Sequence, residues 1–326
     1  MILSHSPVRI FWRIEVTKIM DWSVVLPYIL SGISVGGQYA LIAIGYTMVY
    51  GILRLINFAH GDVFMVAGLM MIYFSASMPM YYSIPLMIIF TVLLGYAIER
   101  AAYKPLRTAP RMSIMISAIG VSYLLENLAL YVTGGLNQNY PGIPWISDSI
   151  TIGGAVTKRV TIITPILTIV LVVALILLIK HTKFGMAMRA VSRDFDTAQL
   201  MGIDIDKVIS VTFIIGSFLA AIGSLLYFTN YTGVVPTSGA MPGLKAFVAA
   251  VFGGIGSIPG AVVGAFIIGI CENLIKGLDS VLMVNGIISQ QFGFATFSDA
   301  FTFVLLIVIL IFKPTGLFGE KQTDKV

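Results

Sequence analysis

Charged residues are scarce in this sequence. Asp, Glu, Lys and Arg make up 11% of its 326 residues, while hydrophobic residues make up 58%. An ordinary globular domain is roughly 25% charged, because its surface faces water. A chain of this length could not cover its surface with so few charges unless most of that surface faced lipid. The composition therefore excludes a water-soluble domain and predicts a multi-pass integral membrane protein.

The sequence also lacks the residues that several enzyme classes require. Its single cysteine, Cys271, can form neither a disulfide within the chain nor a cysteine-based zinc site. It contains no G-x-x-x-x-G-K-S/T loop, so the chain by itself cannot hydrolyse ATP as P-loop proteins do. The three histidines have no H-E-x-x-H spacing, which disfavours a metalloprotease. We therefore expect no catalytic residue, no metal and no cofactor bound by this chain.

Long apolar runs, in contrast, are abundant. A membrane-spanning helix needs roughly 20 residues to cross the hydrocarbon core. Runs of about this length lie near 23–50, 60–78, 82–98, 112–132, 161–179, 208–230, 243–275 and 298–312. They predict an all-α transmembrane bundle of eight to ten spans over 23–319, followed by a short C-terminal tail at 320–326.

Lysine and arginine indicate how the bundle is oriented. The net charge of +5 comes from basic residues in short segments between apolar runs, which favours orientation signals over nucleic-acid binding. The connections at 99–111 and 180–207 are rich in these residues, so both are predicted to be cytoplasmic. Between them, 133–160 is rich in glycine and proline and contains Trp145, as expected for an external loop with an interfacial anchor.

The order of the spans leaves a conflict at the C-terminus. Lys313 and Lys321 favour a cytoplasmic C-terminus. If 208–230, 243–275 and 298–312 each crossed the membrane once, however, the C-terminus would lie outside. We therefore predict that 243–275 is a pair of half-helices that adds no net crossing or two, and Gly36 and Gly37 pose the same puzzle in 23–50. Broken helices at membrane depth line a cavity or are buried in protein, so both places are candidates for a transport path or its hinges. The residues that interrupt 243–275 are Gly253, Gly254, Gly256, Pro259 and Gly260.

The N-terminal extension, residues 1–22, combines Arg9, Arg13 and Lys18 with apolar residues. It is either a basic interfacial helix or sequence upstream of a true start at Met20. The first strong apolar run is too long for a cleavable signal peptide and lacks a small-residue cleavage site.

Polar residues inside the apolar runs are the main candidates for function, because a charge at the bilayer centre costs at least about 2.5 kcal/mol. The candidates for the translocation path are Gln38, Asn57, His60, Gly61, Asp62 and Glu126. For the segment 57–62, helix capping and a role in transport both stay open. Glu272, close to Lys276, is interpreted as a helix anchor at the headgroup level.

A G-x-S-x-G match occurs at Gly32, Ser34 and Gly36. It lies inside an apolar helix rather than at a strand-to-helix turn, which favours close helix packing over a nucleophile. An intramembrane hydrolase, which would need a histidine aligned with Ser34, is the alternative.

The cytoplasmic segment 183–207 differs from its surroundings. Basic and acidic residues alternate there, while large apolar residues recur at roughly helical intervals. This pattern predicts a short amphipathic helix, a turn at Gly202 and a return to the membrane. A solvated loop would not need so many large apolar side chains, so we expect a helix that docks in the groove of a partner, with internal packing as the alternative.

Several motifs together resemble one family. Asp196-Thr197-Ala198 followed by Gly202 is similar to the E-A-A-x-x-x-G motif of ATP-binding-cassette importer permeases, in which a short coupling helix docks on the ATPase subunit. Further matches are Gly36-Gly37-Gln38-Tyr39-Ala40-Leu41, Ile56-Asn57-Phe58-Ala59-His60-Gly61-Asp62, Pro242-Gly243-Leu244-Lys245-Ala246-Phe247, 253–260 and 313–317. Together they resemble the LivH-type permeases of branched-chain amino acid ABC transporters over about 21–319.

The resemblance implies a function, partners and a location. Such a permease lies in the cytoplasmic membrane and imports leucine, isoleucine or valine together with a second, LivM-like permease, two cytoplasmic ATPases that bind ATP and Mg, and an extracytoplasmic binding protein. Arg189, Asp196, Thr197, Ala198 and Gly202 would couple to the ATPases. Relatives with these motifs also serve urea, amides or other amino acids. An ATP-independent channel or secondary transporter is a further alternative.

Overall fold

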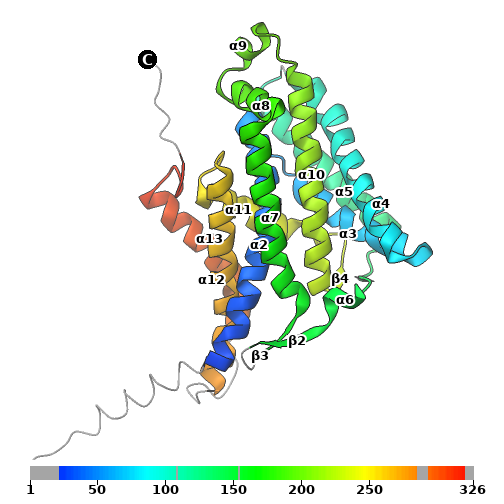
Figure 1. Ribbon diagram of the computed structural model, residues 1–326, viewed down its shortest axis with the longest axis vertical. Helices are drawn as coiled ribbons and strands as arrows, with labels where there is room; N and C mark the ends of the chain where they lie inside the picture. Colours follow the sequence, from blue (N-terminus) through cyan, green and yellow to red (C-terminus); the bar gives the residue numbers. More distant parts are fainter. Residues whose placement is uncertain (1–21, 108, 153–154, 285–292, 320–326) are drawn as a thin grey trace, which may run out of the picture.

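The computed structural model describes residues 22–107, 109–152, 155–284 and 293–319. Within these ranges, seven helices are long and apolar enough to cross a membrane. They are α2 (Trp22–Leu53), α4 (Met80–Ile98), α5 (Arg111–Thr133), α7 (Arg159–His181), α10 (Ile205–Asn230), α12 (Ile258–Val284) and α13 (Phe294–Phe312). Figure 1 shows them packed into one bundle, which confirms the predicted all-α membrane fold. The expectations for residues 1–21 and 320–326 lie outside the described residues.

Two shorter helices, α3 (His60–Ser77) and α11 (Ala240–Gly253), begin inside the bundle. After α2 ends, residues 54–59 lead back between the helices, and the ring of His60 fills the space where a side chain on Gly45 would lie. Gly45 precedes the end of α2 by about two turns, or about 12 Å. α11 begins at the same depth as α3, because Gly239 packs directly against Gly61.

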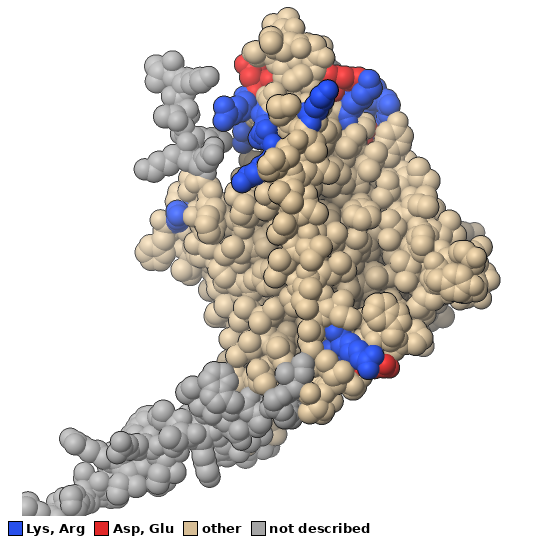
Figure 2. Space-filling model, in the orientation of Figure 1, with Lys and Arg blue, Asp and Glu red and all other residues tan. Residues whose placement is uncertain are grey.

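The end of the bundle that the positive-inside rule assigns to the cytoplasm carries two amphipathic helices. α8 (Lys183–Arg193) and α9 (Phe195–Leu200) follow α7, and a turn with Gly202 at φ +81° leads into α10. A short π-helix, η1 (Glu99–Tyr103), and a 3-10 turn, η2 (Lys104–Leu106), lie at the same end. Figure 2 shows lysine and arginine gathered there, and the connections 99–111 and 183–207 lie at this same end of the bundle, as the prediction requires.

The opposite end carries two short strand pairs. β1 (Gln138–Asn139) pairs with β4 (Gly233–Val234), and β2 (Ser149–Ile152) forms an antiparallel hairpin with β3 (Ala155–Lys158). The short helix α6 (Pro144–Ser147) precedes this hairpin, and the side chain of Trp145 is exposed. The connection between α5 and α7 therefore lies at the end opposite α8 and α9, as the prediction of an external loop requires.

The break predicted in 243–275 is present, but its two parts are unequal. α11 ends at Gly253, positive φ angles at Gly254 and Gly256 reverse the chain, and α12 is a full-length span rather than a half-helix. Because α11 and α12 run in opposite directions, the pair adds two crossings. The end of α13 consequently lies toward the end of the molecule that carries α8 and α9 (Figure 1), as the lysines near the C-terminus require.

The prediction of a break at Gly36 and Gly37 is wrong, because α2 is continuous. These glycines allow close packing instead. A Cβ atom on Gly36 would lie 2.7 Å from Cα of Phe266 in α12, and one on Gly37 would lie 3.0 Å from Oγ1 of Thr168 in α7. Small residues let membrane helices approach closely without interrupting them. Close contacts at these glycines help to make α2 the central helix, which packs against α7, α10 and α12.

Candidate functional site

The start of α3 and the start of α11 meet α5 around a cavity of about 280 Å³. Gly61 and Asp62 line it from α3, and Ser122 and Glu126 line it from α5. The remaining lining residues are mostly apolar or glycine, namely Tyr46, Phe58, Ile119, Tyr123, Gly239, Ala240, Gly243, Leu244 and Phe247. Because Ile119, Tyr123 and Leu244 are exposed, the cavity opens toward the surface of the chain beside α5. Glu126 is thus brought together with Gly61 and Asp62, which the sequence placed in a different segment.

Asp62 is the most deeply buried charged group at this cavity, with only 2% of its surface exposed. Its Oδ2 atom accepts a hydrogen bond of 2.5 Å from the hydroxyl of Ser122. Its Oδ1 atom has no hydrogen-bond partner within the described ranges. A buried carboxylate oxygen without a donor is costly, so this atom is a place where a ligand would be stabilised.

Glycine at the cavity floor lets two helix N-termini touch. A Cβ atom on Gly61 would lie 2.7 Å from the carbonyl oxygen of Gly239, and one on Gly243 would lie 2.9 Å from Cα of Gly61. A larger residue at either position would push α3 and α11 apart. The N-terminus of a helix carries a partial positive charge, and two of them lie at this point.

The residues just before Asp62 support the start of α3. The His60 ring is buried and meets the Tyr46 ring edge-on, with centroids 5.1 Å apart. The side-chain carbonyl of Asn57 accepts a hydrogen bond of 2.7 Å from the hydroxyl of Tyr103. Neither side chain lines the cavity, so both hold the segment 57–62 in place from behind.

The other predicted path residues lie elsewhere. The Gln38 side chain is fully buried and donates to the carbonyl of Leu226 in α10, at 3.4 Å. Residues 253–260 comprise the end of α11, the turn that follows it and the start of α12, and the amides of Leu317 and Phe318 bond there to the carbonyls of Phe252 and Gly253. These two places and the cavity are therefore three separate features of the structure.

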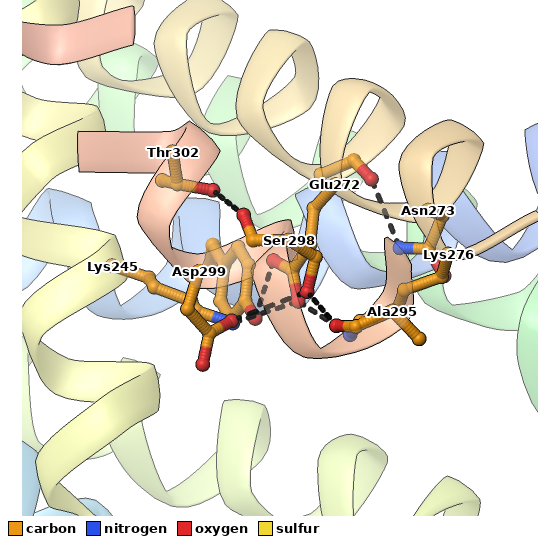
Figure 3. A network of polar contacts seen from close by, with 10 residues as sticks. Lys245, Glu272, Asn273, Lys276, Ala295, Ser298, Asp299 and Thr302 are labelled. Atoms are coloured by element: carbon orange, nitrogen blue, oxygen red, sulfur yellow. Dashed lines mark hydrogen bonds and ion pairs between the residues drawn. The ribbon is translucent and has the colours of Figure 1, made fainter. Parts of the chain in front are cut away.

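A buried ionic network, shown in Figure 3, was not recognised from the sequence. Lys245 of α11 donates to Oε1 of Glu272 in α12 at 2.7 Å and pairs with Asp299 of α13 at 2.6 Å. Lys276 and the hydroxyl of Tyr39 also bond to Glu272, at 2.5 Å and 3.0 Å. The interpretation of Glu272 as a headgroup anchor is wrong, since only 1% of its side chain is exposed. The sequence signal that could have revealed this network is Lys245, a lysine within the apolar run 243–275.

A second network lies at the cytoplasmic end and joins α4 to α10. The fully buried carboxylate of Glu99 bonds to Arg107 and accepts from the hydroxyl of Ser210 at 2.8 Å. Arg107 also pairs with Asp206, which Lys104 contacts at 2.6 Å. The start of α10, directly after the turn at Gly202, is therefore tied to the helices around it.

The helices α8 and α9 present apolar side chains to the outside. Leu200 is 87% exposed and Met201 is 78% exposed, while Ala198 is buried. The side chain of Asp194 caps α9 by accepting from the amide and hydroxyl of Thr197, at 3.0 Å and 2.7 Å. Asp196 is exposed, and Arg189 bonds to the carbonyl of Ile179 at the end of α7. Lys207 holds the pKa of the Asp204 carboxyl below its ordinary value by hydrogen bonding at the start of α10.

Two alternatives gain no geometric support. Ser34 is buried within α2, and its hydroxyl has no hydrogen-bond partner in the part of the chain that the structure describes, so no general base contacts it there. The described residues contain no group of three or more His, Cys, Asp or Glu that could hold a metal ion.

Two shortened helices whose starts meet at a cavity with two carboxylates, inside a bundle of long apolar helices, are the arrangement of a multi-pass membrane permease. Residues 28–310 match the model of the family described as the permease component of the branched-chain amino acid transport system. The chain belongs to this family.

The relatives match nearly the whole chain. It is 37% identical over 314 residues to the high-affinity branched-chain amino acid transport system permease protein LivH of Salmonella typhimurium, covering 92% of this chain and 97% of the relative. The permease BraD of Pseudomonas aeruginosa is also 37% identical, with 92% and 98% covered. LivH of Escherichia coli K12 is 36% identical, with 92% and 97% covered. The protein is therefore a transport permease of the cytoplasmic membrane.

Proposed function

We propose that this chain is the membrane-spanning subunit of an ATP-binding-cassette importer for leucine, isoleucine and valine. The observation that carries the proposal is the exposed apolar surface of α8 and α9, on a chain of the branched-chain permease family that has no P-loop motif of its own. A surface of this kind in water is expected to dock on another protein. Its partners are two cytoplasmic ATPases, which hold ATP and Mg.

A second, homologous permease faces α5 across the translocation path, so that the cavity opens onto the path between the two subunits. An extracytoplasmic binding protein delivers the amino acid at the end that carries β1 to β4. ATP-driven closure of the ATPases moves α8 and α9, and the ion pairs of Arg107 pass this motion to α4 and α10. Tilting of these helices switches the cavity between outward and inward access.

The ATPase contact is tested by Leu200→Asp. A charge in place of Leu200, the most exposed apolar side chain of α9, disfavours docking, so this variant loses co-purifying ATPase and ATP-driven leucine uptake while it stays in the membrane. Leu136→Asp is the matched control, because Leu136 is also exposed but lies on the outer face. Its ATPase content stays at the wild-type level.

The substrate is tested with the wild-type importer in vesicles that contain ATP. Unlabelled isoleucine and valine compete with labelled leucine, whereas urea and acetamide do not. Uptake of urea or acetamide instead of leucine would assign the chain to a different substrate branch, and uptake without ATP would contradict the importer.

A further inference from the structure

The cavity between α3, α5 and α11 has an acidic side. Asp62 and Ser122 are hydrogen bonded, and Glu126 lies one helical turn beyond Ser122 on the same face of α5. None of the residues that line the cavity is a lysine, an arginine or a histidine. The positive charge that would stabilise the two carboxylates is therefore expected to come from whatever occupies the cavity.

The unpartnered Oδ1 atom of Asp62 makes this expectation specific. Its other oxygen is already bonded to Ser122, and the residue is buried, so water does not satisfy it freely. A primary ammonium group has three donors. An ammonium group in the cavity would face both Asp62 and Glu126, because these two carboxylates line it from different helices.

The remaining walls fit the rest of an amino acid. The N-termini of α3 and α11 meet at Gly61 and Gly239, and helix N-termini favour a carboxylate. Ile119, Leu244 and Phe247 supply an apolar wall that suits an aliphatic side chain.

We propose that this cavity binds the transported amino acid as its zwitterion. Asp62 and Glu126 hold the ammonium group, the first turns of α3 and α11 face the carboxylate, and the apolar wall receives the side chain. The inference rests on the proposed function, because it assigns the binding site within the path of that importer.

The first experiment measures leucine moved per ATP hydrolysed in vesicles that contain the complete importer. Asp62→Asn and Glu126→Gln each lower this ratio about tenfold or more, since a charge-assisted hydrogen bond is lost. The KM for leucine stays unchanged, because the binding protein sets it. Glu126→Asp keeps the charge and retains most of the ratio.

The second experiment does not depend on how well these variants fold. In a Cys271→Ala background, Ile119→Cys places a thiol at the mouth of the cavity of the importer, and a maleimide labels it without the binding protein present. Leucine slows labelling severalfold, whereas 4-methylpentanoate, which lacks the ammonium group, and leucinamide, which lacks the carboxylate, do not.

The outcomes separate the two proposals. If the wild-type importer carries no leucine, the proposed function fails and this site fails with it. If the wild type carries leucine but both variants keep its ratio, or if 4-methylpentanoate protects Ile119→Cys as well as leucine does, the site is overturned and the importer stands.

Discussion

Buried polar residues in this membrane protein fall into two kinds. Lys245 pairs with Glu272 and Asp299 across three helices, and Lys245 and Glu272 are both buried away from water. Asp62 and His60 each keep one buried side-chain atom without a partner in the described part of the chain. Paired groups hold helices together, whereas an unpaired group at a cavity is available to a ligand.

The paired network predicts a stability effect. Glu272→Leu removes the acceptor shared by Lys245, Lys276 and Tyr39, and we expect a loss of about 3 kcal/mol in the free energy of unfolding. Lys276→Met removes a partly exposed partner, so its loss stays below about 1 kcal/mol. Denaturant unfolding of the detergent-solubilised protein measures both. Equal losses in the two variants would contradict the expectation that the contribution of Glu272 to the free energy of unfolding depends on its burial.

At the scale of elements, glycine sets how closely helices approach. α2 uses Gly36 against α12 and Gly45 against the ring of His60 at the start of α3. Gly51, in the last turn of the same helix, has no atom within 4 Å of the position that a Cβ would occupy. Close packing therefore requires glycine at positions 36 and 45 of α2, but not at position 51.

This contrast gives a matched pair of alanine substitutions. Gly45→Ala collides with His60 and displaces the start of α3, so we expect it to cost about 1 to 3 kcal/mol and to reduce leucine uptake. Gly51→Ala meets nothing and stabilises the helix by up to about 1 kcal/mol. Thermal unfolding midpoints and uptake by the same preparations report both effects. A Gly45→Ala variant as stable and active as Gly51→Ala would mean that α3 does not begin beside α2.

At the scale of the whole molecule, the two ends differ in charge. Lysine and arginine gather at the end that carries α8 and α9 (Figure 2), while the strands and α6 lie at the other end. Nine passes of the chain between the ends, α3 and α11 included, account for the described residues. An odd number of passes places the end of α13 opposite to the start of α2.

Cysteine labelling tests this arrangement. With Cys271 replaced by alanine, Leu136→Cys should react with a membrane-impermeant maleimide in intact cells, because it is exposed at the outer end. Leu200→Cys should react only after the membrane is permeabilised. The reverse pattern would invert the topology, and with it the side on which the ATPases dock.

The sequence alone determined the properties that depend on composition and on local pattern. The scarcity of charge required a membrane bundle, the basic connections gave its orientation, and the spacing in 183–207 gave an exposed amphipathic segment with a turn at Gly202. These features follow from how single segments interact with lipid and water, so no knowledge of distant contacts is needed.

Only the tertiary structure decided which polar residues meet. Asp62 and Glu126 lie on different helices and share one cavity, while Gly36 and Gly37 pack inside a continuous helix rather than breaking it. Glu272 could be read as an anchor because Lys276 is its neighbour in sequence, yet Lys245 and Asp299 reach it from two other helices. Pairing between distant segments depends on how whole helices cross, and a hydrophobic pattern does not specify those crossings.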